Sequence, residues 1–182
     1  MLDGVRYALS CPSRSRFDFQ AAPYAVVSIH RFENIFTGRL TATIIPLLKR
    51  VAQQMNLIFV LHPTTRERLL SLGLYDQLAA GPNIVPHERF GFIDWIGVCS
   101  EARFVITDGG SNQEELSYLG VPTLLLRTET ERREGLGENV VLSSLKQQVI
   151  DHFLGHVDDF RRPASLSRAR PSDAIIETIR SL

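Results

Sequence analysis

The chain has 182 residues, which suits one domain, and its 20 basic and 20 acidic side chains give a formal net charge of zero. Because proteins that bind nucleic acids or anionic membranes usually carry a basic excess, this balance argues against both kinds of partner. The sequence has no apolar run of the ~20 residues that span a membrane, its start lacks the pattern of a signal peptide, and its two cysteines are isolated, which together favour a cytoplasmic protein.

The predicted elements begin after an irregular start. Residues 1–22 show no sustained periodicity, and we interpret them as a linker that trails from a preceding domain. Short apolar runs then predict strands at 24–29, 57–61, 83–85, 104–107, 123–126 and 139–142. Helical patterns lie between them at 37–55, 64–72, 92–99 and 113–119, and two more follow at 144–154 and 173–181. Pro46 predicts a kink in the first helix or a later start for it.

This alternation predicts an α/β fold, a Rossmann-like three-layer domain over residues 23–182 whose parallel sheet is covered by helices on both faces. In such sheets, ligands bind beyond the carboxyl ends of the strands. Five segments should therefore meet at that edge, and they contain nearly all of the chemically notable residues: 28–34, 62–64, 86–88, 107–111 and 127–134.

A glycine pair follows one predicted strand, in the segment TDGGSNQEE at 107–115. Gly109 and Gly110 leave no side chain between the backbone and a ligand, and the helix start that follows offers unpaired N–H groups to a phosphate. Ser111 either adds a hydroxyl to that site or caps the helix. The chain contains no P-loop motif, and the absence of GxGxxG argues against a dinucleotide site.

Acidic, basic and aromatic residues flank this turn. Glu114 and Glu115 cannot share one helix face, so one is expected to face the cleft, where a carboxylate can bind ribose hydroxyls. The charged run at 128–134 is either a solvated loop or the source of an arginine that clamps a diphosphate. Trp95 either packs in the core or stacks on a base.

Histidines follow the first two strands. His30 opens the segment HRFEN and is either a structural residue or a general acid or base, since an unperturbed histidine has a pKa of ~6.5. His62 repeats the strand-end pattern more weakly. His87 is a third candidate, but its neighbours Pro86 and Glu88 suggest an ordinary loop.

Five segments in this order resemble the non-hydrolysing UDP-N-acetylglucosamine 2-epimerase family, and the resemblance covers about residues 24–182. They read HRFEN at 30–34, HP at 62–63, TDGGSNQEE at 107–115, LGVP at 119–122 and RTETERREG at 127–135. The resemblance implies the C-terminal half of a two-domain B-type glycosyltransferase fold. It also implies an isomerase that inverts C2 of a UDP-sugar by elimination and re-addition of UDP, as in cell-surface polysaccharide biosynthesis, with neither metal nor nicotinamide.

The resemblance further implies a role for each matching residue. It implies that His30 is catalytic and that Arg31 and His62 line the cleft. Trp95 would lie against the uracil and Glu115 would bind the ribose hydroxyls. The diphosphate would be held by Gly109, Gly110, Ser111 and Arg132. There are departures from the family pattern. The family's Ser-Gly-Gly order is Gly-Gly-Ser here, which moves the hydroxyl along the turn, and Phe32 and Arg133 replace residues that are commonly Arg or Pro.

The resemblance extends over only one of the family's two domains. We therefore expect a fragment that lacks its N-terminal domain, binds UDP weakly, catalyses nothing by itself and belongs to a homodimer when complete. Three alternatives remain open. They are the donor-binding domain of a nucleotide-sugar glycosyltransferase, the hydrolysing branch of the epimerases, and a non-catalytic UDP-sugar-binding remnant.

Overall fold

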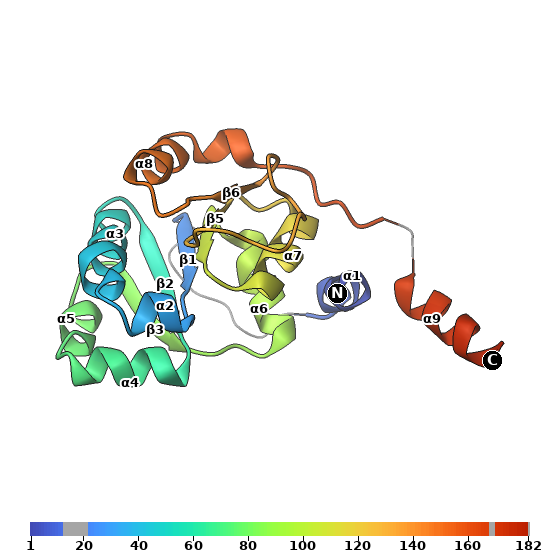
Figure 1. Cartoon of the computed structure of the whole chain (residues 1–182), viewed down its shortest axis with the longest axis horizontal. Coiled ribbons are helices and arrows are strands. Elements are labelled where there is room, and N and C mark those ends of the chain that lie inside the picture. The colour runs from blue at the N-terminus through green and yellow to red at the C-terminus, as the bar shows by residue number, and fades with distance from the viewer. Residues whose placement is uncertain (13–21, 168–169, 182) are drawn as a thin grey trace.

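The structure is a computed structural model that describes residues 1–12, 22–167 and 170–181. Six parallel strands form one sheet in the order β3-β2-β1-β4-β5-β6, and helices cover both of its faces (Figure 1). This is the strand order of doubly wound Rossmann folds, so the predicted three-layer sheet is confirmed. In the described part of the chain, no helix is both long and apolar enough to cross a membrane.

The strand register sets up the ligand-binding edge. The strands are β1 Tyr24–Ser28, β2 Asn56–Leu61, β3 Ile84–Glu88, β4 Phe104–Thr107, β5 Thr123–Leu125 and β6 Val140–Leu142. Ser28, the last residue of β1, pairs with Val60 of β2 and with Thr107 of β4. The residues that follow these three strands are therefore brought to one edge of the sheet.

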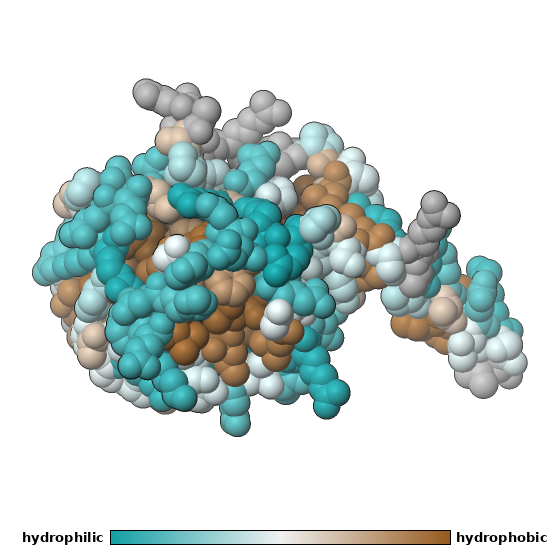
Figure 2. Space-filling model, turned by 90° about the horizontal axis from the view of Figure 1, so that it is seen from above, coloured by the Kyte–Doolittle hydropathy of each residue, from teal (hydrophilic) through white to brown (hydrophobic). Residues whose placement is uncertain are grey.

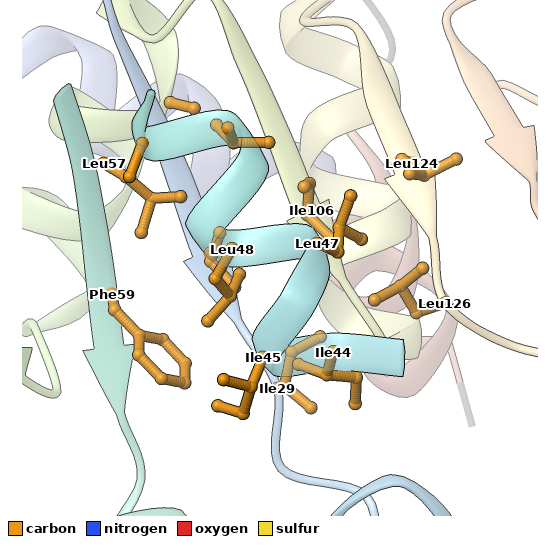
Figure 3. Packing of buried hydrophobic residues seen from close by; sticks show 14 of the residues in the cluster. Ile29, Ile44, Ile45, Leu47, Leu48, Leu57, Phe59, Ile106, Leu124 and Leu126 are labelled. Atoms are coloured by element: carbon orange, nitrogen blue, oxygen red, sulfur yellow. The ribbon is translucent and has the colours of Figure 1, made fainter. Parts of the chain in front are cut away.

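Two hydrophobic layers hold the helices on the sheet. The helical elements are α1 Leu2–Ser10, α2 Phe32–Ile35, the π-helix η1 Leu40–Ile44, α3 Ile45–Ala52, α4 Pro63–Ser71, α5 Tyr75–Ala79, α6 Phe92–Glu101, α7 Gly110–Leu119, α8 Gln147–Gly155, the 3-10 helix η2 Val157–Phe160 and α9 Pro171–Arg180. Successive side chains of a strand point to opposite faces of the sheet, so Val27 packs with α3 on one face and Val26 packs with α6 on the other. Figure 3 shows Leu48 of α3 on the side of Phe59 and Leu47 beside Ile106, both facing the sheet.

One proline and one glycine mark changes in helix geometry. Pro46 is the second residue of α3, and the π-helix η1 ends just before that helix, so the helix is irregular where proline cannot donate an N–H. Gly120 ends α7 in the left-handed region with a φ of 66°. A Cβ at Gly120 would also lie 2.1 Å from the carbonyl oxygen of Arg162, so only glycine fits there.

The N-terminal segment differs from the linker expected for residues 1–22. Leu2–Ser10 forms the helix α1, which packs against α6 and α7 and buries Val5 and Ala8 in the second hydrophobic layer. Residues 13–21 of the expected linker lie outside the described residues. The domain boundary at residue 23 stays a prediction.

Two further elements differ from expectation. The strand predicted at 83–85 continues through Pro86, His87 and Glu88, which we expected to be a loop. Proline is tolerated there because β3 is an edge strand with one unpaired side. At the other end of the chain, α9 stands apart from the sheet and shows hydrophobic side chains on its surface (Figures 1 and 2). None of its described residues is buried.

Candidate functional site

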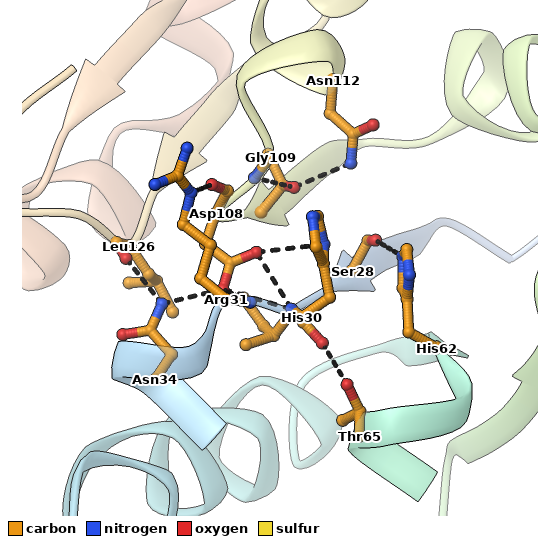
Figure 4. Close-up of polar contacts among 12 residues, drawn as sticks. Ser28, His30, Arg31, Asn34, His62, Thr65, Asp108, Gly109, Asn112 and Leu126 are labelled. Carbon is orange, nitrogen blue, oxygen red and sulfur yellow. Dashed lines mark hydrogen bonds and ion pairs between the residues drawn. The ribbon is translucent and has the colours of Figure 1, made fainter. Parts of the chain in front are cut away.

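The ends of β1 and β2 bring two histidines into contact. The rings of His30 and His62 stack with their centroids 4.2 Å apart and their planes inclined by 20°. Ser28 Oγ lies 3.4 Å from Nε2 of His62 (Figure 4). Burial, followed by the nearby His30 and Arg89, lowers the pKa of His62 to about 4. His62 is therefore neutral near pH 7. The side chain of His30 is 35% exposed.

Asp108 at the end of β4 organises the segment that begins with His30. Its carboxylate is buried and accepts the backbone N–H of His30 at 3.0 Å, the backbone N–H of Arg31 at 2.9 Å and the side-chain amide of Asn34 at 2.9 Å (Figure 4). Nδ1 of His30 lies 3.3 Å from the same carboxylate. Asp108 was not among the predicted site residues, although its place directly before Gly109 was a signal that could have identified it.

A cavity opens at the edge formed by β1, β2 and β3. Four predicted site residues line it, namely His62, Trp95, Ser111 and Glu115. Its other lining residues had no predicted role, although Ser28 begins one of the five segments expected at this edge: Ser28, Val60, Arg89, Phe90, Phe92 and Asn112. Arg89 and Phe90 directly follow β3, so the underestimated length of that strand hid them. The cavity joins cationic, carboxylate, hydroxyl and aromatic groups, which is the composition of a small polar-ligand site.

Trp95 and Glu115 form a buried hydrogen bond inside this cavity. The indole Nε1–H of Trp95 donates to Oε2 of Glu115 at 2.8 Å, and the two residues are 7% and 5% exposed. Burial raises the pKa of the Glu115 carboxyl, while the Trp95 hydrogen bond opposes that rise. Both of the roles considered for Trp95 keep structural support, since it packs in the core and also lines the cavity.

The glycine turn is crowded on both sides. Gly109 is the N-cap of α7, and a Cβ there would lie 3.0 Å from Asn112 Nδ2 and 3.1 Å from His30 Cε1. A Cβ on Gly110 would lie 3.1 Å from Arg132 Nε. Glycine therefore lets the backbone at the start of α7 come close to a ligand, and the first N–H groups of a helix have no intrahelical partner.

Arg132 lies over this turn and is held there by an ion pair with Glu114. Its Nε atom is buried and has no hydrogen-bond partner among the described residues. The neighbouring Arg127 pairs instead with Glu131, at 2.9 Å. Of the two arginines, Arg132 is therefore the one beside the glycine turn.

Arg31 lies apart from the main cavity. Its Nε donates to the carbonyl oxygen of Asp108 at 2.9 Å, and its side chain lines a neighbouring polar hollow with Arg39 and Arg127. The predicted site residues thus fall into two groups that meet at the glycine turn. One group lines the cavity with Glu115, and the other, His30 and Arg31, follows β1 and is anchored by Asp108.

Comparisons with known proteins agree on one family. The family model described as UDP-N-acetylglucosamine 2-epimerase matches residues 4–173. The chain is 32% identical over 118 residues to the UDP-N-acetylglucosamine 2-epimerase of Methanococcus maripaludis. This alignment covers 64% of this chain and 32% of that protein. It is 30% identical over 131 residues to the enzyme of the same name from Methanocaldococcus jannaschii, covering 70% of this chain and 36% of that protein.

Solved structures give the same fold. The chain superposes on the M. jannaschii UDP-GlcNAc 2-epimerase in complex with UDP-GlcNAc and UDP with a TM-score of 0.77 at 22% identity, covering 99% of this chain and 49% of that one. For the S. aureus MnaA–UDP co-structure the TM-score is 0.78 at 20% identity, covering 99% and 51%. The chain thus spans about half the length of these solved chains, in agreement with the predicted C-terminal domain. It belongs to the UDP-N-acetylglucosamine 2-epimerase family.

Proposed function

We propose that this chain is the UDP-binding C-terminal half of a non-hydrolysing UDP-N-acetylglucosamine 2-epimerase. The complete enzyme would interconvert UDP-GlcNAc and UDP-ManNAc by eliminating UDP and adding it back, and it would act as a cytoplasmic homodimer. The observation that carries the proposal is the cavity in which Glu115 and Trp95 lie beside the glycine turn and the start of α7. Membership of the epimerase family supports the reaction class.

The nucleotide is proposed to lie along this cavity. Glu115 binds the ribose hydroxyls, because an ionised carboxylate accepts hydrogen bonds from a diol. The diphosphate lies at Gly109, Gly110 and Ser111, where the start of α7 favours an anion. Arg132 adds a bidentate cation there, and the aromatic lining of the cavity contacts the base.

The sugar would then lie beyond the diphosphate, beside His30. His30 Cε1 is 3.1 Å from the position that a Cβ of Gly109 would occupy, so its ring borders the proposed phosphate site. A histidine there can act as a general acid toward the phosphate oxygen that leaves the sugar. The resemblance implies that the groups that exchange the C2 proton belong to the family's other domain, so this chain alone is proposed to bind UDP without turnover.

Calorimetric titration of UDP into the wild-type chain and into Glu115→Ala tests the proposal. We expect saturable binding to the wild type and at least about tenfold weaker binding to the variant, because a buried hydrogen bond to a charged group contributes about 1.5–3 kcal/mol. Glu138→Ala, which removes the same charge from an exposed residue, should bind UDP like the wild type. Equal binding of UDP to the wild type and to Glu115→Ala would contradict the proposed site.

Product analysis on a complete protein decides the reaction. Interconversion of the two UDP-sugars supports epimerisation without hydrolysis. Release of free N-acetylmannosamine and UDP would assign the protein to the hydrolysing branch. Transfer of the sugar to an added acceptor would make it a glycosyltransferase.

A further inference from the structure

We propose that Trp95 is a positioning residue that makes the site require ribose hydroxyls, so that it selects ribonucleotides over deoxyribonucleotides. The indole N–H would do this by fixing the direction of the Glu115 carboxylate. This inference rests on the proposed function, because it assigns a specificity to the same nucleotide site. It gives Trp95 a role beyond contact with the base.

The two carboxylate oxygens of Glu115 have different surroundings. Oε2 of Glu115 accepts the indole N–H of Trp95 at 2.8 Å. Within the described part of the chain, Oε1 accepts no hydrogen bond, and it is not among the buried polar atoms that lack a partner. Since Glu115 lines the cavity, Oε1 is the oxygen that a ligand can reach.

The indole that donates this hydrogen bond is held rigidly. The indole of Trp95 is packed in the hydrophobic layer that also contains Ile96, Val98 and Leu116. A side chain held this way has one direction for its N–H, and the carboxylate that it binds has one direction for its free oxygen. The cavity therefore presents a fixed acceptor rather than a mobile one.

A fixed acceptor penalises a ligand that lacks a hydroxyl. A buried site built to bind a hydroxyl discriminates strongly against a ligand that lacks it, because the site's own polar atom is left unpaired. Burial raises the pKa of Glu115, and the Trp95 hydrogen bond acts in the opposite sense, toward the ionised form that accepts from the diol. A phenylalanine at position 95 would supply similar apolar area but no N–H.

Binding of UDP, 2′-deoxy-UDP and 3′-deoxy-UDP to the wild type and to Trp95→Phe tests the inference by calorimetry. We expect the wild type to bind UDP at least about tenfold more tightly than at least one deoxy analogue. In Trp95→Phe this affinity ratio should fall below about threefold. The matched control is Phe92→Leu, which changes another aromatic residue of the cavity wall. Phe92→Leu should weaken the binding of all three ligands equally and leave the ratio of their affinities unchanged.

A spectroscopic measurement tests the hydrogen bond itself. The chain has one tryptophan and therefore gives one indole ¹H–¹⁵N cross-peak. We expect a downfield cross-peak that moves upfield in Glu115→Gln, which retains the side-chain shape but removes the charge. Because this measurement needs no change at position 95, it keeps the inference testable if Trp95→Phe does not fold.

The outcomes separate the inference from the function on which it rests. UDP binding with an unchanged discrimination ratio in Trp95→Phe overturns the inference alone, as does an indole cross-peak that is identical in the wild type and Glu115→Gln. Failure of the wild-type chain to bind UDP overturns the proposed function as well.

Discussion

The two sides of the glycine turn differ in how completely this chain assembles them. On the side of the proposed nucleotide site, Trp95 and Glu115 are buried and hydrogen-bonded to each other, so this chain alone fixes their positions. On the other side, Asp108 holds the backbone of His30 and Arg31, whose side chains are only partly buried. Under the proposed function, this difference means that the nucleotide-binding groups are preorganised within this domain, whereas the catalytic group is completed by the other domain.

The largest expected effect breaks the anchor on the His30 side. Asp108→Ala removes a buried carboxylate that accepts hydrogen bonds from His30, Arg31 and Asn34. We expect a loss of about 3 kcal/mol in the free energy of unfolding, because these donors are left without an acceptor. Urea unfolding measures it, with the exposed Asp159→Ala as control. A loss below about 0.5 kcal/mol, the range of ordinary surface changes, would contradict the anchoring role.

A smaller effect is expected where the backbone must approach the ligand. The Cβ of Gly109→Ala would lie 3.0 Å from Asn112 Nδ2 and 3.1 Å from His30 Cε1, although the φ of −83° suits alanine. We expect about tenfold weaker UDP binding with little change in stability, which calorimetry and thermal unfolding measure. Gly91→Ala is the matched control, since it also caps a helix and its Cβ would meet nothing within 4 Å. Equal UDP affinities of the two variants would show that the turn does not contact the nucleotide.

A pH effect is expected at the histidine stack. The folded-state pKa of His62 is lowered from 6.5 to about 4, so the unfolded chain binds more protons between these values. Stability from this group is therefore present above pH 6.5 and is lost as the pH falls toward 4. Between pH 7 and pH 4.5, the free energy of unfolding should fall by about 1 kcal/mol less in His62→Gln than in the wild type. This figure allows for solvent screening at a half-buried ring. An identical pH dependence of the urea midpoints would contradict this account.

The smallest expected effect concerns the ion pair that holds Arg132. Glu114→Gln removes a negative charge beside the proposed diphosphate and releases the guanidinium from its partner. We expect UDP to bind about threefold more tightly, the scale of a partly exposed ion pair. Glu129→Gln, an exposed acid in the neighbouring hollow, is the control. Weaker binding to Glu114→Gln would mean that Glu114 aims Arg132 rather than competing for it.

The periodicity of the sequence was sufficient to predict the sheet, because each buried strand is a short apolar run between turns. It was insufficient for α1, whose buried residues Leu2, Val5 and Ala8 give too brief a pattern, and for the end of β3, where Pro86 resembles a loop. Topology then identified the edge at which the site residues collect, while their individual roles stay predictions.

The contacts inside the site could not be predicted in the same way. The hydrogen bond between Trp95 and Glu115 joins residues on α6 and α7, and its geometry depends on how the two helices pack on the sheet. The buried Asp108 likewise reaches residues that are more than 70 positions away in the sequence. Such contacts follow from the fold and leave no local pattern that a reading of the sequence can detect.

The most direct test of the central claim follows the emission of the single tryptophan during a UDP titration. Because Trp95 lines the cavity and binds Glu115, the claim that this chain carries a complete nucleotide half-site predicts a saturable change in its fluorescence. The change should be strongly reduced when the titration is repeated with Glu115→Ala. Emission that stays constant up to millimolar UDP in the wild-type chain would contradict the account.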